Sequence, residues 1–305
     1  MNVIVKSLLR RFARVARPHL RSIGLLQTAG MFARSTLVWT PGNERVVVLA
    51  PHMDDETIGC GGTIALHAQR GAKIDVIFMT DGRNGGGLGS LEGDARQRRQ
   101  LELISMRKQE GIAALSALGV EDFHCLEICD GRLAHEVTRA SLQLRELLEQ
   151  LRPDFVYLPM FSEEHSDHRA TSAVLMQAVQ GTSLSFQCAG YEVWTALTPN
   201  CFVDVTTTMQ IKRRAVACYR SQLEDADYEH AIVGLNAYRS MAFLNARGSY
   251  AEAFFMCSLQ QYAKAYGEFV RALQGRSAVI ASSDNFTTKT QSNPSAPVDA
   301  TKAWS

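Results

Sequence analysis

No stretch of this 305-residue chain approaches the run of about 20 apolar residues that a membrane-spanning helix needs. The chain also has almost no net charge: 32 basic residues balance 31 acidic ones, for a formal charge of +1 at pH 7. A general nucleic-acid-binding protein needs a basic surface. We therefore expect neither a membrane-spanning protein nor a nucleic-acid-binding one.

A pairing pattern is also missing from the cysteines. There are seven, an odd number, and several lie in apolar runs, such as Cys218 and Cys257. Cys125 and Cys129 are spaced as Cys-x-x-x-Cys, but no second pair accompanies them to complete a zinc site. We therefore expect reduced cysteines in the core of a cytoplasmic protein.

Acidic residues are absent from residues 1–43, where seven residues are basic. Apolar residues recur there at roughly helical spacing, which predicts a basic amphipathic extension before the main domain. It is not a secretory signal, because basic residues interrupt its apolar core. Three interpretations remain open: residues 1–35 bind weakly to an anionic membrane surface, they form a helix packed on the domain, or they are a transit peptide in a eukaryote.

A complete dinucleotide-binding fingerprint is missing as well. The run from Gly59 to Ile64 has no glycine at its sixth position, and acidic residues crowd the turn where a pyrophosphate would lie. Tight packing of the first helix behind the preceding loop explains these glycines better.

What the chain does contain is an alternation of apolar strands and helices. We expect strands at residues 46–50, 74–80, 123–129 and 155–160, and helices at residues 57–70, 96–118, 136–151 and 170–180. This order predicts an α/β fold: a single Rossmann-like domain with a mostly parallel sheet and helices on both faces. Shorter strands (190–194, 202–205) and helices (209–220, 260–273) complete the domain, which we place at residues 44–275.

Two segments depart from this regular pattern. The loop at residues 81–93 holds six glycines, and a loop of this length is more often functional or mobile than a plain connector. Residues 276–305 are rich in Ser, Thr, Asn and Pro, so we expect a disordered tail there.

The most informative stretch, Pro51-His52-Met53-Asp54-Asp55-Glu56, directly follows the first strand. Three neighbouring carboxylates repel one another unless a cation or a solvent-facing cleft relieves them. His52 and Asp55 offer a nitrogen and an oxygen ligand three residues apart, a mixture that zinc binds readily. A carboxylate left over beside the metal is able to transfer protons.

A second cluster, His165-Ser166-Asp167-His168, follows the strand at residues 155–160. Both clusters therefore come just after the C-terminal ends of strands, where open α/β sheets place their ligands. We expect a metal site at this edge of the sheet. The ligand types indicate zinc, with iron(II) as an alternative.

These two motifs, in this order on separate strands, resemble those of the PIG-L/LmbE-like family of zinc-dependent N-deacetylases. Further matches are Gly59-x-Gly61-Gly62, Arg107-x-x-Glu110, Asp130-Gly131 and the run from Tyr191 to Trp194. The resemblance covers roughly residues 44–270, with Met53 where the family usually has proline. It implies a hydrolase that removes the acetyl group from an N-acetylglucosamine-type amino sugar carried on a lipid, a glycan precursor or another aglycone.

The resemblance also implies roles for single residues. The zinc ligands would be His52, Asp55 and His168, with one coordination position left open. Asp54 would act as the general base and later protonate the leaving amine. His165, in its protonated form, would stabilise the oxyanion.

Other roles follow from the same resemblance. Asp167 would orient a histidine. Arg107 and Asp130 match positions that contact the sugar hydroxyls, although Arg107 has the alternative of a surface salt bridge with a glutamate of its own helix, and Asp130 that of shaping a turn. Arg83, on the glycine loop, is a further candidate contact. Trp194 is either a sugar-stacking residue or a core aromatic.

Two other functions are compatible with these residues. A thiol-conjugate amidase of the same family would need the same zinc site and differ only in its pocket. A non-catalytic sugar-binding member would keep the fold, but decayed enzymes usually lose a ligand or the base, and here the set is complete. We therefore expect an enzyme whose partner is an N-acetylated amino sugar, and the sequence does not indicate an oligomeric state.

Overall fold

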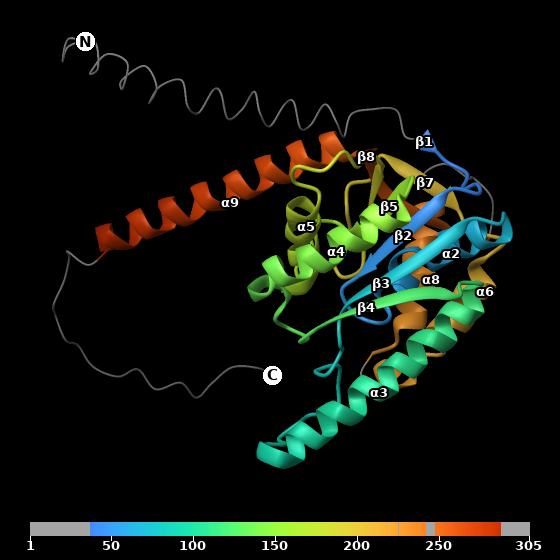
Figure 1. Cartoon of the computed structure of the whole chain (residues 1–305), viewed down its shortest axis with the longest axis horizontal. Coiled ribbons are helices and arrows are strands. Elements are labelled where there is room, and N and C mark those ends of the chain that lie inside the picture. Colours follow the sequence, from blue (N-terminus) through green and yellow to red (C-terminus); the bar gives the residue numbers. More distant parts are fainter. Residues whose placement is uncertain (1–36, 225, 242–247, 288–305) are drawn as a thin grey trace, which may run out of the picture. The chain divides into compact units, whose positions relative to one another are not determined.

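The computed structural model describes residues 37–224, 226–241 and 248–287 of the chain (Figure 1). The basic segment expected at residues 1–35 and the end of the expected tail lie outside the described residues. The chain divides into two compact units, Met1–Lys264 and Ala265–Ser305, and the sheet and the candidate site belong to the first. No helix in the described ranges is long and apolar enough to cross a membrane. Four of the seven cysteines are buried (Cys60, Cys188, Cys201, Cys257), and the other three are partly buried.

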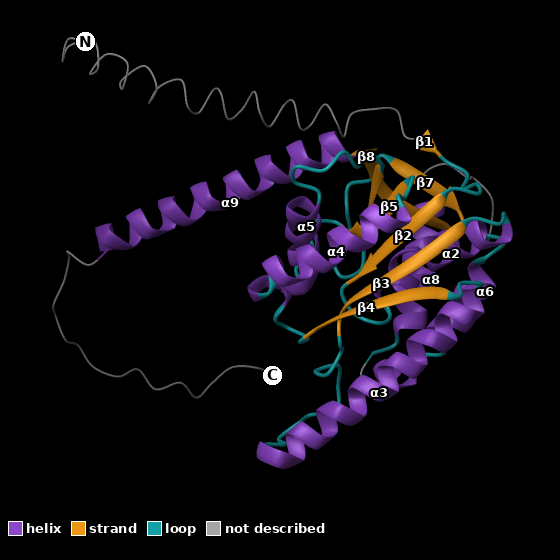
Figure 2. Cartoon of the chain, in the orientation of Figure 1, coloured by secondary structure: helices purple, strands orange, loops and turns teal. Residues whose placement is uncertain are grey.

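An eight-stranded sheet lies at the centre of the first unit (Figure 2). Its strand order is β1-β7-β8-β6-β5-β2-β3-β4. β8 runs antiparallel to its neighbours β6 and β7, and the other described pairings are parallel. The strands are β1 (Leu37–Val38), β2 (Arg45–Ala50), β3 (Lys73–Thr80), β4 (Asp122–Ile128), β5 (Phe155–Pro159), β6 (Gln187–Tyr191), β7 (Cys201–Asp204) and β8 (Ala251–Ser258).

Helices cover both faces of this sheet, as the alternating pattern predicts. α2, α3 and α6 pack against one another on one face, and α4 and α5 pack together on the other (Figure 1). The helices are α2 (Asp55–Gln69), α3 (Gly93–Leu118), the 3-10 helix η1 (Leu133–His135), α4 (Val137–Leu151), α5 (Ser166–Ala178), α6 (Met209–Val216), α7 (Arg220–Leu223), α8 (Tyr228–Ser240) and α9 (Leu259–Thr287).

The central strands are buried on both sides. Every residue from Val46 to Ala50 is at most 2% exposed. Val46 and Val48 belong to the core cluster that includes residues of α2 and α3, so Val47 and Leu49 point to the opposite face, because successive side chains of a strand alternate. Burial on both faces explains why β2 is a continuous apolar run rather than an alternating one.

The predicted strands and helices up to residue 205 are confirmed, with small shifts at their ends. Beyond that point the pattern is less informative. It gives no clear signal for α8 or for β8. The helix expected at residues 209–220 ends at Val216 (α6), and a separate short helix, α7, begins at Arg220.

Elements of the structure lie across both ends of the predicted domain. β1 pairs with β7, and Trp39 stacks on Phe155 with 4.9 Å between ring centroids, so the fold begins before residue 44. At the other end, α9 runs across residue 275, the predicted end of the domain, and residues from Ala265 on belong to the second compact unit. The run Ala278–Ala281 is compatible with a helix, which the polar composition of the tail obscures.

Glycines let α2 lie close to its neighbours. A Cβ atom on Gly59 would lie 2.2 Å from the Tyr191 ring, and one on Gly62 would lie 2.7 Å from Val205. Both distances are too short for a real side chain. The packing interpretation of these glycines is therefore confirmed.

A buried ion pair supports the middle of α2. The helix is interrupted at Cys60, which has a non-helical φ of −144°. Beyond this kink, the N–H groups of Gly62 and Thr63 both donate to the Glu252 carboxylate at 2.8 Å. Lys212 donates to the same carboxylate at 2.6 Å, and both charged side chains are fully buried. The pair thus holds the second half of α2 against β8.

Candidate active site and metal centre

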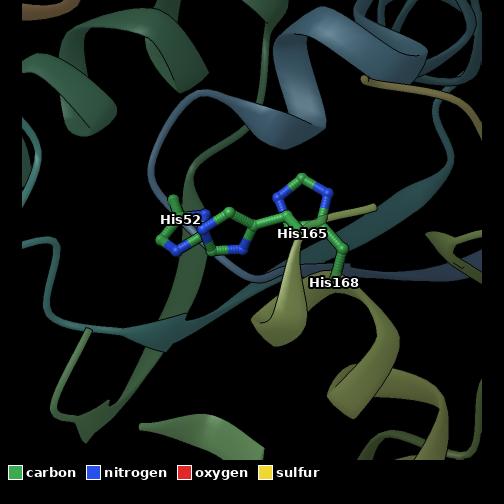
Figure 3. A group of neighbouring side chains, drawn as sticks. All are labelled: His52, His165 and His168. Atoms are coloured by element: carbon green, nitrogen blue, oxygen red, sulfur yellow. The ribbon is translucent and has the colours of Figure 1, made fainter. Parts of the chain in front are cut away.

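Parallel pairing of β2 with β5 brings the two sequence motifs together. The two strands are neighbours in the sheet, so their C-terminal ends meet at one edge. The first motif forms the turn between β2 and α2, and the second begins α5. As a result His52, His165 and His168 lie side by side, with ring centroids 4.8 to 5.4 Å apart (Figure 3).

Asp54, at the turn before α2, has an unusual backbone conformation. Its φ of 149° and ψ of −30° lie in a region that residues with a side chain rarely adopt. Its N–H group donates to Glu56 Oε2 at 3.2 Å. Strain of this kind concentrates at functional sites, which agrees with the position of Asp54 in the first motif.

Asp55 contacts both His52 and His168. Asp55 Oδ2 lies 3.2 Å from His52 Nδ1 and 3.2 Å from His168 Nε2. Both nitrogens of the His168 ring are buried, yet neither makes a hydrogen bond within the described structure. Buried polar atoms normally have partners. One nitrogen from each of the two histidines, together with the Asp55 carboxylate oxygen, is a set of ligands that suits Zn²⁺ or Fe²⁺. Among the residues that the structure describes, two groups have ligand atoms that all lie within 4.8 Å of one another: His52, His165 and His168, and His52, Asp130 and Asp167. The cluster therefore suits a metal ion, and the ligand set His52, Asp55 and His168 stays a prediction.

The charges in this cluster depend on one another. Burial lowers the pKa of His168, but the Asp55 carboxylate outweighs this effect and raises it to about 9. Burial also raises the pKa of Asp55, whereas His168 and His52 bring it well below its usual range. The carboxylate thus favours positive charge at the centre of the cluster, supplied by protons on the histidines or by a metal ion.

Asp54 has a different partner, on α3. Its Oδ2 lies 3.1 Å from Arg107 Nη2, and Arg107 also donates to the Met53 carbonyl oxygen at 2.6 Å. Burial raises the pKa of Asp54 to about 7, against the opposing effect of Arg107, and the Asp55 charge adds to the rise. A carboxyl group that titrates near neutrality is well suited to accept and return a proton.

Arg107 is not a surface residue. It is only 2% exposed, and a Cβ atom on Gly85 would lie 2.0 Å from its Nη1 atom. The alternative of a surface salt bridge with Glu102 or Glu110 is therefore wrong, and Glu110 instead accepts hydrogen bonds from Ser221. The absence of side chains in the glycine loop leaves room for the guanidinium group.

Two further carboxylates lie on the other side of the His52 ring. His52 Nε2 is 3.2 Å from Asp130 Oδ1 and 3.5 Å from Asp167 Oδ2. Asp167 also accepts the backbone N–H groups of Gly131 at 2.7 Å and Leu133 at 3.1 Å. The histidine next to Asp167 is therefore His52, and Asp130 does more than shape a turn. Outer carboxylates in such positions orient a ligating histidine.

His165 lies beside His52 and His168, the two histidines predicted to be ligands, with one nitrogen of each ring within 4.8 Å of the others. Its Nδ1 accepts the Asp167 N–H at 3.3 Å, so a neutral ring carries its proton on Nε2. Burial lowers the pKa of His165, and His52 and His168 lower it further. These surroundings favour the neutral ring over the protonated form that the resemblance implies.

Glu163 is a site residue that the motif analysis did not single out. It is 1% exposed, and its Oε2 lies 3.7 Å from His168 Nδ1. Its carboxylate accepts, at 2.7 to 3.2 Å, the backbone N–H groups of three consecutive residues, Val193, Trp194 and Thr195. The sequence gives only a weak signal for Glu163, because Glu163 and Glu164 both precede the second motif. They are distinguished by burial: Glu163 is buried and Glu164 is exposed.

The remaining candidates surround this centre. Arg83 pairs with Asp81, and its side chain is 35% exposed. Glu56 is fully buried and accepts a hydrogen bond from the Tyr219 hydroxyl at 2.5 Å, so it is tied into the core. Trp194 is 56% exposed, so it is not the core aromatic that was one of its two expected roles.

Histidines and buried carboxylates therefore meet at the C-terminal edge of a mostly parallel sheet, a combination that defines a candidate metal-dependent hydrolase. Residues 47–179 match the model of the PIG-L family, described as GlcNAc-PI de-N-acetylase. This match supports the resemblance to the PIG-L family of N-deacetylases that the two motifs imply.

Known relatives agree with this assignment. Diacetylchitobiose deacetylase of Thermococcus kodakarensis is 28% identical over 204 residues, which cover 61% of this chain and 73% of the relative. A 1D-myo-inositol 2-acetamido-2-deoxy-alpha-D-glucopyranoside deacetylase of a Mycobacterium species is 31% identical over 154 residues, or 45% of this chain and 50% of the relative. The chain thus spans only half the length of some curated relatives.

A solved structure shows the same fold. N,N'-diacetylchitobiose deacetylase from Pyrococcus horikoshii superposes with a TM-score of 0.58 at 26% identity. The superposition covers 70% of this chain and 83% of that structure.

Proposed function

We propose that this protein is a metal-dependent hydrolase that removes the acetyl group from an N-acetylglucosamine-type sugar joined to a carrier. The observation that supports this most strongly is the buried cluster of His52, Asp55 and His168, with the Asp54 carboxyl group beside it. The relatives are named as deacetylases of diacetylchitobiose and of a glucosamine–inositol conjugate. An acetamido sugar is common to both, and the second ring differs.

In this proposal the metal is zinc, with iron(II) as the alternative, and it is held by His52, Asp55 and His168. When bound, the ion polarises the acetyl carbonyl group and makes water a stronger acid. Asp130 and Asp167 orient His52 through its Nε2 atom, which leaves Nδ1 facing the centre of the cluster.

Asp54 moves the protons. It takes one from water as the water oxygen bonds to the acetyl carbon, and it returns one to the sugar nitrogen as the C–N bond breaks, giving acetate and a free amine. The contact with Arg107 fixes the carboxylate and offsets part of the effect of burial, so the ionised form is accessible near pH 7. Arg107 therefore acts through Asp54.

His165 supplies a hydrogen-bond donor. Its Nε2–H group donates to the carbonyl oxygen as negative charge builds up there. A neutral ring is sufficient, because Nδ1 is engaged as the acceptor of the Asp167 N–H. Arg83 and Asp130 are the proposed contacts of the sugar hydroxyls, since both lie at the glycine loop, where Asp130 accepts the Asn84 N–H at 3.0 Å.

The two alternative functions differ from this proposal in distinct ways. A thiol-conjugate amidase would use the same cluster, so the choice of substrate separates it from a deacetylase. A non-catalytic sugar-binding protein would have no use for a strained Asp54 that titrates near pH 7, and that observation favours an enzyme.

Acetate release tests the proposal. Protein loaded with zinc or iron(II) is incubated with N-acetylglucosamine joined to a second sugar, to inositol, to a lipid and to a thiol conjugate, with Asp54→Ala alongside. We expect acetate from at least one conjugate and a loss of at least about 100-fold in kcat for the variant. Metal-bound protein that releases no acetate, or a variant that matches the wild type, would refute the proposal.

A further inference from the structure

Trp194 is exposed to solvent yet supported by a second aromatic ring. It lies in the loop that follows β6 and is 56% exposed. Its ring packs against Tyr228, at the start of α8, with 5.6 Å between centroids and 64° between the ring planes. Aromatic pairs attract in this edge-to-face arrangement. The indole therefore presents a supported apolar surface to solvent.

Two buried carboxylates hold the backbone of this loop. Glu163 accepts three consecutive N–H groups from residues 193–195. Glu192 accepts the Leu197 N–H at 2.9 Å and pairs with Arg239 at 2.5 Å, and Arg239 also donates to the Leu197 carbonyl oxygen at 3.0 Å. A loop fixed in this way presents its exposed side chain with little ordering cost when a ligand binds.

The backbone of Trp194 lies close to the candidate active site. Glu163, which anchors the Trp194 backbone, is 3.7 Å from His168 Nδ1. On the other side, Tyr228 packs against the same apolar cluster as Ile58, in the first turn of α2. β6 is also the parallel neighbour of β5, so the loop after β6 starts at the same sheet edge as the second motif.

We propose that Trp194 and Tyr228 form a stacking site for a saturated six-membered polyol ring joined to the reacting amino sugar. This inference rests on the proposed function. Such a ring carries hydroxyls around its edge and C–H groups on its faces, so a face packs on an indole while the hydroxyls stay in water. Trp194 is linked to the metal cluster through its backbone: its N–H group donates to Glu163, which lies 3.7 Å from His168 Nδ1. The site therefore suits the ring next to the reacting sugar rather than the reacting sugar itself.

Calorimetric binding to zinc-loaded Asp54→Ala protein tests this without turnover. The ligands are the methyl glycoside of N-acetylglucosamine, its β-1,4-linked disaccharide and its inositol conjugate, so the two rings are compared with a ringless control. We expect at least one ring-bearing ligand to bind about tenfold more tightly than the methyl glycoside, which is the scale of one aromatic stacking contact. Trp194→Ala in the same background should remove most of that difference, and Trp194→Phe should keep most of it.

Tyr238→Ala is the matched control, because Tyr238 is 66% exposed and lies near the opposite end of α8. It should leave all three affinities unchanged. A Trp194→Ala variant that weakens every ligand equally or none, or a parent protein without preference for a ring, would overturn the stacking site. Acetate release is measured separately on the wild type. If it is absent while the ring preference and its dependence on Trp194 persist, the proposed function fails and the stacking site stands.

Discussion

Replacing Glu163 with Gln tests how the metal centre is held. The Glu163 side chain is fully buried, and its Oε2 lies 3.7 Å from His168 Nδ1. Glutamine keeps the size and one acceptor oxygen but removes the negative charge, and its NH₂ group cannot accept the backbone N–H groups that the carboxylate now accepts. The substitution therefore weakens both the orientation of His168 and the anchor of the Trp194 loop.

The size of the effect follows from the geometry. Loss of a carboxylate that orients a ligating histidine typically lowers metal affinity about 10–100-fold. The contact with His168 is longer than a hydrogen bond, so we expect the lower end, about tenfold, or about 1.4 kcal/mol. An unsatisfied buried N–H group costs about 1–3 kcal/mol of folding stability, which leaves an ordinary domain folded at room temperature.

Zinc affinity is measured by competition with a chromophoric chelator at pH 7.5, with circular dichroism to confirm that each variant is folded. Glu164→Gln is the matched control, because Glu164 is the adjacent carboxylate but is exposed. It should bind zinc as the wild type does. Glu163→Gln with wild-type affinity, or an equal loss in Glu164→Gln, would show that Glu163 does not support the centre.

Three further predictions concern the same machinery. Asp54→Ala should lower kcat by at least about 100-fold while elemental analysis finds an unchanged zinc content; a fall in zinc would instead make Asp54 a ligand. Lys212→Met leaves Glu252 buried without its cation and should lower the free energy of unfolding by about 3–5 kcal/mol, and a denaturation midpoint equal to that of the wild type would contradict this. The folded pKa of His168, about 9, lies above its ordinary value of 6.5, so protonated His168 stabilises metal-free protein fully below pH 6.5 and progressively less as pH rises through 9. Zinc affinity should therefore rise with pH across this window, because the ion displaces that proton, and a pH-independent affinity would disprove the link.

The sequence predicts the central strands well because their burial leaves a direct trace. β2 reads as an unbroken apolar run, and the first motif begins directly after it. The order of strands in the sheet leaves no such trace. Val46 pairs with Phe155 across more than 100 residues of chain, and that pairing, not the motifs themselves, places His52 beside His168. Because parallel strands end at the same edge of a sheet, the sequence predicts that the two histidines lie near each other. It does not predict the distance between them.

β8 was harder to predict because its sequence contains a charge. Glu252 interrupts an otherwise apolar run, and a carboxylate is normally a sign of exposure. In the fold it is fully buried, because Lys212 and two N–H groups of α2 satisfy it. These partners lie on other elements, so a local pattern could not reveal that Glu252 belongs to the core.

The partners of Arg107 in the candidate active site could not be predicted from a local sequence pattern either. Its helix carries Glu102 and Glu110 at spacings that suggest a surface salt bridge, and helical periodicity alone supports that view. The deciding factor is Gly85, some twenty positions earlier in the chain, where a side chain would overlap the guanidinium group. Because that space is open, Arg107 reaches Asp54 in a buried setting, where burial raises the pKa of the acid and the arginine opposes the rise. The motif thus predicts that Asp54 is the base, whereas the surroundings that shift its pKa depend on the glycine loop and on α3.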